Sequence, residues 1–370
     1  MNILAFRIFD SKPFGNGGER REAQLNEVYN ELGIQRTYYG MHIKPLTIGL
    51  WWRALRLVMQ SQNRVIFRHL FTHPKAVYHY LQAWAWNVDS LKTFFLQKED
   101  RFVYEGSAAY HYVVVEEAFR QKKHVVAVMH NIETLVPGSR SEITQHYAPV
   151  DFLNEVSLLR QCETVFMISK EETWLMRLYG VNAYYLPYYP AKECRDWLLQ
   201  IRTAREQQEK ENRHTYLVVG SAINSPTAIG MQQLVDYTAK YLPDITLRVG
   251  GYGTDSRIRI PADCKNVVLL GELSQEQLTQ EMMDCTAILI NQPPTTGALT
   301  RIVEAEIAGI PVIANTDSMR DYFNIQGIYE YRTLDELSSV LHQDLAVPEV
   351  PNRPDYSLFE KAVCRRTADN

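Results

Sequence analysis

Residues 287–315 read AILINQPPTTGALTRIVEAEIAGIPVIAN and decide the fold of the second half of the chain. An apolar run ends at Asn291 and a Pro-Pro pair, and a loop of small residues follows. A helical pattern over residues 299–308 is then stopped by Gly309, and a second apolar run follows at 311–314. This order predicts a strand, a loop, a helix and a strand, which form a right-handed crossover in a parallel sheet. Ligands bind beyond the carboxyl ends of such strands, so the loop is predicted to line a site.

The start of the predicted helix suits an anionic ligand. The backbone N–H groups of Gly297, Ala298 and Leu299 lie where a helix start can face an anion. Arg301 and Glu304 are three residues apart, which places a cation and a carboxylate on one helical face. A surface Arg–Glu pair on an ordinary crossover helix would explain the same spacing, so other parts of the chain must decide between the two.

The same segment resembles the signature of glycosyltransferase family 4. The matching residues are Gly297-x3-Arg301-x2-Glu304-Ala305-x3-Gly309-x-Pro311-Val312. Members of this family are retaining enzymes of the GT-B fold, in which two Rossmann-like domains face each other. The resemblance implies that Glu304 holds the ribose hydroxyls of a sugar nucleotide. It also implies that Arg301 and the helix start hold the diphosphate.

The order of strands and glycines extends this resemblance over nearly the whole second half. Gly251 and Gly271 follow predicted strands, where a nucleotide would approach the backbone closely, although tight turns also explain each glycine. The sequence departs from the family at residues 221–224, which read SAIN where many members have an Arg and a Lys. We therefore expect Arg301, the helix-start amides and Arg20 to carry the diphosphate charge.

The first residues of the chain predict a Rossmann-like opening. A strand over residues 2–8, a loop containing Gly17 and Gly18, and a helix over residues 19–32 that contains Arg20 form this opening. No full GxGxxG occurs, so the loop alone is weak support for nucleotide binding. Further apolar runs alternate with helical patterns, which predicts a parallel sheet; they cover residues 102–104, 125–129, 165–168 and 183–186.

The fold class predicted from these patterns is α/β, with two Rossmann-like domains and parallel sheets. The first domain is predicted over residues 1–187, with a helical insertion at about 41–100, and the second over 215–350. The polar, charge-rich residues 188–214 are predicted to link the two domains. Residues 351–370 are predicted to contain a C-terminal helix, which in the GT-B fold commonly packs back on the first domain.

Three side chains that follow predicted strands of the first domain are candidates for the site. His130 stands at the carboxyl end of the 125–129 strand, on the side where ligands bind. The family resemblance implies a histidine near the donor sugar here, and a hydrogen-bonded loop histidine is the alternative. Glu133 and Glu105 are candidates for contact with the acceptor.

Composition and charge exclude several classes of protein. The 370 residues suit two domains, and the net charge of −4 argues against a nucleic-acid partner. Five scattered cysteines without a CxxC indicate a reducing cytoplasm. The sequence has no apolar run long enough to span a membrane. It also has no Asp-x-Asp pair and no His/Cys cluster with metal spacing, so we expect a metal-independent protein without a cofactor.

Residues 41–98 concentrate basic and aromatic side chains. They hold eight Lys or Arg residues against one acid, Asp89, and four of the six tryptophans. Ile48, Trp52 and Met59 follow a helical spacing, with Arg53 on another face. Basic amphipathic helices with tryptophan suit an anionic membrane surface or a lipid-linked acceptor. A helical layer that simply packs on the first domain would show the same aromatic spacing.

Taken together, the sequence predicts a retaining glycosyltransferase of hexosyltransferase type. It would move a sugar from a nucleotide-diphosphate donor to a saccharide or lipid-linked acceptor in cell-surface glycan synthesis. His130, Arg301 and Glu304 would serve the chemistry, in the cytoplasm or at the inner face of the membrane. A sugar-nucleotide epimerase of the same fold and a catalytically weak, nucleotide-sugar-binding subunit are the alternatives.

Overall fold

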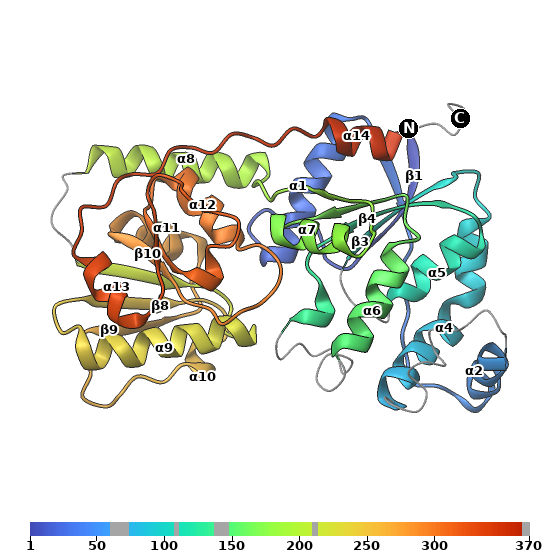
Figure 1. Cartoon of the computed structure of the whole chain (residues 1–370), viewed down its shortest axis with the longest axis horizontal. Helices are drawn as coiled ribbons and strands as arrows, with labels where there is room; N and C mark the ends of the chain where they lie inside the picture. The colour runs from blue at the N-terminus through green and yellow to red at the C-terminus, as the bar shows by residue number, and fades with distance from the viewer. Residues whose placement is uncertain (60–73, 107–110, 137–147, 209–213, 365–370) are drawn as a thin grey trace.

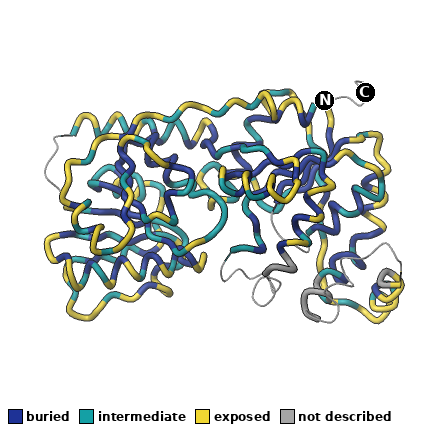
Figure 2. The backbone as a smooth tube through the Cα atoms, in the orientation of Figure 1, coloured by how far each residue is buried: buried dark blue, intermediate teal, exposed yellow. Residues whose placement is uncertain are grey.

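The computed structural model describes residues 1–59, 74–106, 111–136, 148–208 and 214–364. The chain forms two α/β domains that lie side by side, each built around a parallel sheet (Figure 1). The central strands are among the most deeply buried parts of both domains (Figure 2), as expected for parallel sheets covered by helices on their faces. The structure therefore confirms the predicted fold class of two Rossmann-like domains.

The first sheet has the order β2-β1-β3-β4-β5-β6, and all its neighbouring strands pair in parallel. The strands are β1 (Asn2–Arg7), β2 (Gln35–Tyr38), β3 (Arg101–Gly106), β4 (His124–Met129), β5 (Thr164–Met167) and β6 (Ala183–Tyr185). The helices of its α/β repeats are α1 (Gly17–Glu31), α5 (Tyr112–Arg120), α6 (Ala148–Leu159) and α7 (Lys170–Leu178). A short 3₁₀ helix, η2 (Glu133–Leu135), follows β4.

Helix α1 starts two residues earlier than the sequence pattern predicts, because a capping box fixes its first turn. The Asn16 side chain accepts a hydrogen bond from the Glu19 N–H at 3.1 Å, and the Glu19 carboxylate accepts one from the Asn16 N–H at 2.9 Å. Because Asn16 is the N-cap residue, the helix begins at Gly17, and both Gly17 and Gly18 belong to its first turn. The glycine loop thus ends at the helix start, beside the carboxyl ends of the strands.

The helical insertion consists of α2 (Ile48–Met59) and α4 (Pro74–Phe95). Helix α4 packs on the first domain, where Trp84 and Phe95 are buried in its core. Helix α2 packs on α4 through Ala54 and Trp51, and Trp51 lies 5.7 Å from the Tyr78 ring. The insertion occupies the end of the molecule farthest from the second domain (Figure 1).

The second sheet has the order β12-β11-β10-β7-β8-β9 and is also parallel. Its strands are β7 (Thr215–Val219), β8 (Thr246–Gly250), β9 (Val267–Gly271), β10 (Ala287–Ile290), β11 (Val312–Asn315) and β12 (Ile328–Tyr331). Its helices are α9 (Ser225–Tyr241), α10 (Thr254–Arg257), α11 (Gln275–Asp284), α12 (Thr300–Ala308), η3 (Thr316–Ser318) and α13 (Leu334–Leu341). The 287–315 segment forms the expected crossover, β10–α12–β11.

Two helices join the domains. Helix α8 (Lys192–Gln207) occupies most of the segment predicted as a linker, and it packs on the second domain. Its Arg202 donates hydrogen bonds to the carbonyls of Glu306 and Ile307 at the end of α12. Helix α14 (Ser357–Cys364) crosses back to the first domain, where Phe359 lies 5.2 Å from the Phe166 ring. These connections hold both domains with the carboxyl ends of their sheets toward a common interface (Figure 1).

Candidate functional site

The start of α1 in the first domain and the start of α12 in the second domain meet at the domain interface. A Cβ atom built on Gly17 would lie 3.9 Å from the Thr300 hydroxyl, so the glycine loop reaches the first residue of α12. A Cβ on Gly18 would lie 2.6 Å from the Phe9 ring. Close packing against Phe9 is therefore enough to require glycine at this position. The structure thus brings together Gly17, Gly18 and the 297–304 segment, as the sequence analysis expects.

Glu304 lies at this interface and is only 6% exposed. One carboxylate oxygen accepts a hydrogen bond from the Tyr188 hydroxyl at 2.8 Å, and the other forms an ion pair with Arg20. Burial lowers the pKa of Arg20, but the Glu304 carboxylate, together with the nearby Cys194 and Tyr188 side chains, raises it above its usual value. Arg20 is also fixed by the Gly15 carbonyl at 2.8 Å. Arg20 and Glu304, which were both predicted to bind the nucleotide, therefore form an ion pair with each other across the two domains.

Arg301 points from α12 toward the carboxyl end of β7. Its Nη1 donates a hydrogen bond to the Val219 carbonyl at 2.9 Å, and a Cβ on Gly220 would lie 2.5 Å from that nitrogen. Burial lowers the Arg301 pKa to about 10, so the side chain remains a cation at neutral pH. Its buried Nε has no hydrogen-bond partner among the described residues. The structure thus holds an incompletely satisfied cation next to residues 221–224, where the sequence has none.

Gly251 and Gly271 have backbone reasons to be glycine. Gly251 has φ +124°, and a Cβ there would lie 2.1 Å from the Gly220 carbonyl oxygen. Gly271 has φ +71° and lies against the Asp255 carboxylate. The Gly251 N–H also donates to the Gly271 carbonyl at 2.7 Å. These contacts make the strand ends of the second sheet close-packed, and they account for both glycines without a ligand.

The loop before α12 is held by two side chains that the sequence analysis missed. Glu172 of α7 is buried and accepts hydrogen bonds from the Gly297 N–H at 2.7 Å and the Ile132 N–H at 3.3 Å. Arg320 donates to the Thr295 carbonyl and to the Gly297 carbonyl, the latter at 2.9 Å. The Gly297 amide, predicted to face an anion, is therefore already occupied by a carboxylate. Ala298 and Leu299 complete the loop, with Leu299 as the N-cap residue of α12.

His130 lies on the first-domain side of the same loop. A Cβ on Gly297 would lie 3.3 Å from the His130 carbonyl oxygen, and the Phe9 ring meets the imidazole edge-on at 5.2 Å. Burial lowers the His130 pKa to about 4, so the ring is neutral at pH 7. Its Nε2 lies 3.2 Å from a carboxyl oxygen of Glu22, a residue of α1. His130 is thus a neutral, oriented imidazole at the interface.

Behind His130, two acidic residues are buried together. Burial raises the pKa of Glu22 to about 7 and that of Glu105 to about 8, and the neighbouring Glu22 adds to the Glu105 shift. Arg36 lies 3.5 Å from the Glu105 carboxylate and is the nearest compensating cation. Glu105, which was predicted to contact the acceptor, is fully buried and does not reach the surface. Glu133 is half-buried and is the first residue of η2, three residues after His130.

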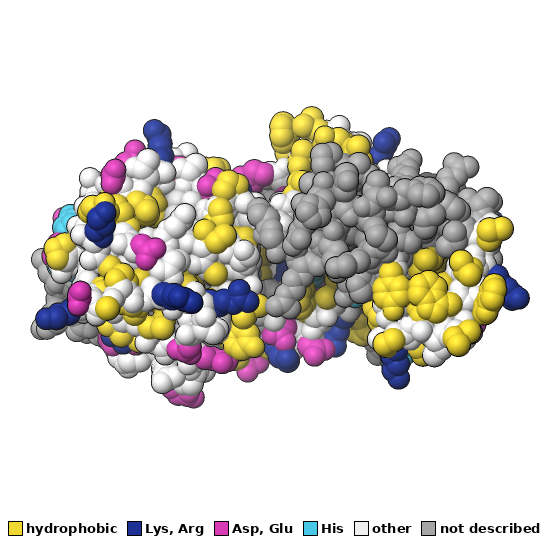
Figure 3. Space-filling view, turned by 90° about the horizontal axis from the view of Figure 1, so that it is seen from below, with side chains coloured by type: hydrophobic (Ala, Val, Ile, Leu, Met, Phe, Trp, Pro, Cys, Tyr) yellow, Lys and Arg dark blue, Asp and Glu magenta, His cyan; other side chains and the backbone are white. Residues whose placement is uncertain are grey.

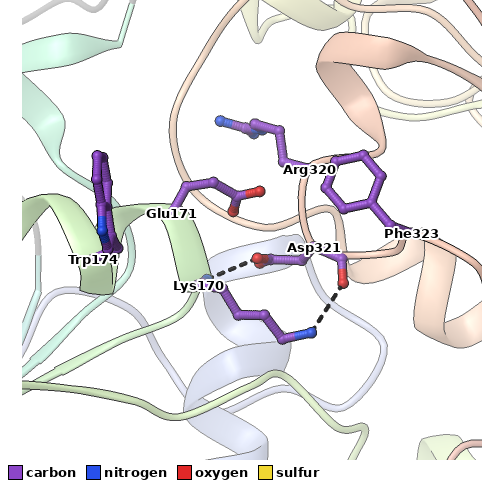
Figure 4. Close-up of a pocket in the computed structure, with 6 residues that line it drawn as sticks. All are labelled: Lys170, Glu171, Trp174, Arg320, Asp321 and Phe323. Atoms are coloured by element: carbon purple, nitrogen blue, oxygen red, sulfur yellow. Dashed lines mark hydrogen bonds between the residues drawn. The ribbon is translucent and has the colours of Figure 1, made fainter.

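An interdomain cavity of about 340 Å³ lies on the other side of the loop (Figure 4). Lys170, Glu171 and Trp174 of α7 face Arg320, Asp321 and Phe323 of the second domain. The Asp321 carboxylate accepts a hydrogen bond from the Lys170 N–H at 2.7 Å. Burial raises the pKa of Asp321 to about 8, and Glu171 adds to the shift. This contact ties α7 to the second domain beside Arg320.

The described residues contain no group of three or more His, Cys, Asp or Glu side chains arranged to hold a metal ion. Within the same described residues, no helix is long and apolar enough to cross a membrane.

Solved structures with the GT-B fold resemble nearly the whole chain. HepE from Anabaena, solved with UDP and glucose, has a TM-score of 0.58 at 16% identity, over 92% of this chain and 89% of that chain. Sucrose-phosphate synthase from Thermosynechococcus elongatus also has a TM-score of 0.58, at 14% identity over 92% and 88%. Trehalose-6-phosphate synthase from Burkholderia multivorans reaches 0.58 at 11% identity over 93% and 91%. The chain therefore has the GT-B fold. No protein-family model and no curated protein sequence matches it.

Proposed function

We propose that the protein is a retaining glycosyltransferase that uses a nucleoside-diphosphate sugar, as the resemblance to family 4 implies. The observation that carries this proposal is the position of Arg301, a buried cation at the end of β7 whose Nε has no hydrogen-bond partner among the residues that the structure describes. Glu304 lies one turn further along the same helix. A cation and a carboxylate at the carboxyl ends of a parallel sheet suit a diphosphate and a ribose.

Arg301 supplies the charge that residues 221–224 lack. Family members commonly place an Arg and a Lys after the first strand of this domain, and here the Arg301 guanidinium reaches the same strand end from α12. The bond from the sugar C1 to the diphosphate oxygen breaks, and a bond from C1 to the acceptor oxygen forms on the same face. The acceptor proton passes to the departing diphosphate. Arg301 and the remaining loop amides, those of Ala298 and Leu299, stabilise the charge on that leaving group without a metal ion.

Binding the nucleotide requires a change of partners at Glu304. Both carboxylate oxygens are engaged by Tyr188 and Arg20. The ribose hydroxyls can replace the Arg20 guanidinium at the Glu304 carboxylate. Arg20, which follows the glycine loop, is then free to bind the diphosphate. His130, neutral and oriented by Glu22, would accept a hydrogen bond from the donor sugar.

The direct test is calorimetric titration with a panel of nucleoside diphosphates and their sugars, followed by product analysis with acceptors. UDP and UDP-glucose are the first choices, because HepE was solved with both. We expect binding without added metal and transfer with retained configuration. Failure of every sugar nucleotide to bind would refute the proposal.

Two other functions of the same site remain candidates. An epimerase would convert the donor alone, and product analysis without acceptor identifies it. A catalytically weak binding subunit is favoured by one observation, the occupation of the Gly297 amide by Glu172. Tight nucleotide binding without turnover on a broad acceptor panel would support that candidate.

We also propose that the protein works at the anionic inner face of a membrane, in the synthesis of a cell-surface glycan. The basic, tryptophan-rich segment 41–98 supports this proposal, and part of it, residues 60–73, lies outside the described residues. Arg53 and Arg56 lie on α2, which also exposes Ile48, Trp52 and Met59 to solvent. Figure 3 shows a hydrophobic patch at the end of the molecule that carries α2 and α4.

A further inference from the structure

Glu22 and His130 form a buried pair at the domain interface. The Nε2 atom of His130 lies within hydrogen-bond distance, 3.2 Å, of the Glu22 Oε1 atom. The Glu22 side chain is fully buried, and the His130 side chain is 9% exposed. No other residue that the structure describes hydrogen-bonds to the imidazole ring, so its Nδ1 is left for a ligand. A change at Glu22 can therefore reach a ligand through the ring.

Neighbouring contacts hold Glu22 and the imidazole in place. The residue before Glu22, Arg21, donates hydrogen bonds to the Leu186 carbonyl at 2.6 Å and to the Pro187 carbonyl at 2.8 Å. These bonds fix α1 against the end of the first domain. The edge-on contact with the Phe9 ring fixes the plane of the imidazole. The distance between Glu22 and the ring is thus set by the fold.

The hydrogen bond between Glu22 and His130 has two forms. When Glu22 is ionised, its carboxylate accepts a hydrogen bond from Nε2–H, and Nδ1 carries a lone pair. When Glu22 is protonated, it donates to Nε2, and the ring proton lies on Nδ1. The change from the second form to the first releases one proton to solvent. The ionisation of Glu22 therefore decides whether Nδ1 accepts or donates a hydrogen bond.

Surrounding groups decide when Glu22 ionises. Burial raises its pKa to about 7, whereas a hydrogen bond with Glu105 and the nearby arginines act in the opposite direction. Burial and the neighbouring Glu22 raise the pKa of Glu105 further, to about 8, so Glu22 loses its proton first. The pKa of His130 is lowered to about 4, mainly by burial, so the ring stays neutral. The charged and titratable groups around Glu22 are Arg7 of β1, Arg21 of α1, Arg36 and Tyr38 of β2, Glu105 of β3 and His130.

The form with a lone pair on Nδ1 suits the transfer reaction. When the bond from the sugar C1 to the diphosphate oxygen breaks, positive charge develops on the sugar. A lone pair directed at the sugar stabilises this charge, whereas an N–H group opposes it. The negative charge of ionised Glu22 behind the ring acts in the same direction as the lone pair.

Resting on the transferase function proposed above, we propose that Glu22 is a positioning residue for sugar transfer. Its ionised carboxylate holds the proton of His130 on Nε2 and leaves Nδ1 as an acceptor toward the donor sugar. Protonation of Glu22 reverses this arrangement and lowers the rate of transfer. The activity of the site should therefore rise with pH as Glu22 ionises.

NMR of wild-type protein, labelled with the NMR-active nitrogen isotope in its histidines, identifies the tautomer directly. The His130 resonances are those that disappear in His130→Gln. We expect a neutral ring throughout, with its proton mainly on Nδ1 at about pH 6 and mainly on Nε2 at about pH 8. In Glu22→Gln, the tautomer should not change with pH. A wild-type tautomer that stays the same, or a ring that becomes cationic in this range, would overturn the proposal.

The pH dependence of kcat tests the role of Glu22 in turnover of UDP-glucose, measured as release of UDP. In the wild type, kcat should rise about tenfold between about pH 6 and about pH 8, as expected for one group with a pKa near 7, and KM should change by less than about twofold. Glu22→Gln should lose this rise. If Glu22 were only structural, the substitution would lower kcat at every pH and leave the rise in place.

Glu155→Gln is the matched control. Glu155 is another buried carboxyl of the first domain, and burial raises its pKa to about 7 as well. It accepts hydrogen bonds from the Thr134 hydroxyl at 2.6 Å and the Tyr112 hydroxyl at 2.7 Å, not from His130. Both the tautomer change and the rise in kcat should persist in this variant. Their loss in Glu155→Gln, or their persistence in Glu22→Gln, would contradict the proposal.

The two measurements also separate this inference from the proposed function. If the tautomer changes as expected but no sugar nucleotide binds or turns over, the assignment of the Glu22–His130 pair stands, and its role in transfer falls together with the transferase proposal. If UDP-glucose turns over while kcat shows no rise that depends on Glu22, the transferase proposal stands and the positioning role is wrong.

Discussion

Glu304 is paired with Arg20, and we expect a bound nucleotide to replace that partner. In Glu304→Gln, we expect nucleotide binding to weaken by about 1.5–3 kcal/mol, because a charged hydrogen-bond acceptor for the ribose is lost. The same change leaves Arg20 as a buried cation without its partner, so the melting temperature should also fall. Calorimetry and thermal unfolding measure the two effects.

The double variant Arg20→Gln/Glu304→Gln separates the two roles of Glu304. Removing both charges should restore much of the stability but not the nucleotide affinity. If Glu304→Gln binds every nucleotide as tightly as the wild type, Glu304 is only an interdomain contact.

Arg301 is expected to act mainly on the leaving group. A cation that stabilises charge developing on the diphosphate contributes more in the transition state than in the ground state. Arg301→Ala should therefore lower kcat more than it raises KM, by about 10²-fold or more if the side chain is an essential donor. Arg301→Lys, which keeps the charge but loses the Val219 contact geometry, serves as the comparison. A change in KM alone would show that Arg301 only holds the donor.

The buried pair behind His130 predicts how stability depends on pH. The folded-state pKa of Glu22 is raised to about 7, above its usual value of 4.5, so the folded protein binds more protons between these values. Stability should therefore fall as pH rises from about 4.5 to 7. In Glu22→Gln, the melting temperature should decrease less over this range than in the wild type. Parallel pH dependence in the two proteins would contradict the assignment, and Glu276→Gln, at a surface position, is the control.

At the scale of elements, apolar runs identified most strands but missed one edge strand of each sheet. The runs at 125–129 and 287–290 lie in β4 and β10, because the strands of a covered parallel sheet are apolar on both faces. The edge strands β2 (QRTY) and β12 (IYEY) were missed because they are short and contain polar residues, which an edge strand tolerates. The other edge strands, β6 and β9, were predicted. Helix α8 forms most of the segment predicted as a partly helical linker, in which charged residues outnumber buried ones.

Local sequence places the candidate residues on their helices and strands, but it does not reveal the contacts that they make with distant atoms. The spacing of Arg301 and Glu304 correctly placed both on α12 at the interface. Glu172 and Arg320 were missed because their partners are backbone atoms of a loop far away in sequence. The pattern Ser-x-x-Glu at residues 169–172 signals a helix start, but it does not reveal that the carboxylate binds Gly297.

The packed strand ends of the second domain give an element-scale prediction. Gly251→Ala should reduce the free energy of unfolding by more than about 1–3 kcal/mol, because the new Cβ meets the Gly220 carbonyl and φ is +124°. Gly33→Ala, at φ +64° with open space around it, measures the cost of positive φ alone. Denaturant unfolding compares the two. Equal losses would show that the close approach at Gly220 contributes nothing.

At the scale of the whole molecule, the domain interface is the feature that sequence patterns describe least. The ion pair between Arg20 and Glu304 joins residues 284 positions apart, and Asp321 binds the start of α7 from the other domain. These contacts close the interface in the structure without a ligand. A nucleotide that takes Glu304 from Arg20 would therefore also change the contact between the domains.

The distribution of charge over the molecule predicts how it binds membranes. Segment 41–98 carries eight cations and one acid, whereas the whole chain has a net charge of −4. Each Lys or Arg near an anionic surface contributes about 1 kcal/mol, and the exposed Trp52 suits the headgroup region. We expect the protein to co-sediment with anionic liposomes at low salt and to be released as salt rises, because screening shortens the field.

Four substitutions in this segment test whether its charge drives membrane binding. Replacing Arg53, Arg56, Arg64 and Arg68 with Gln should abolish sedimentation with liposomes and leave nucleotide affinity intact; Arg64 and Arg68 lie outside the described residues. The matched control replaces four exposed cations of the second domain with Gln, namely Lys240, Arg257, Arg259 and Lys265. Because the control removes the same charge from the acidic remainder of the chain, it should still sediment. Wild-type protein that stays in the supernatant at low salt would show that α2 and α4 are only a helical layer of the first domain. Equal loss in both variants would show that net charge, and not the position of the segment, governs binding.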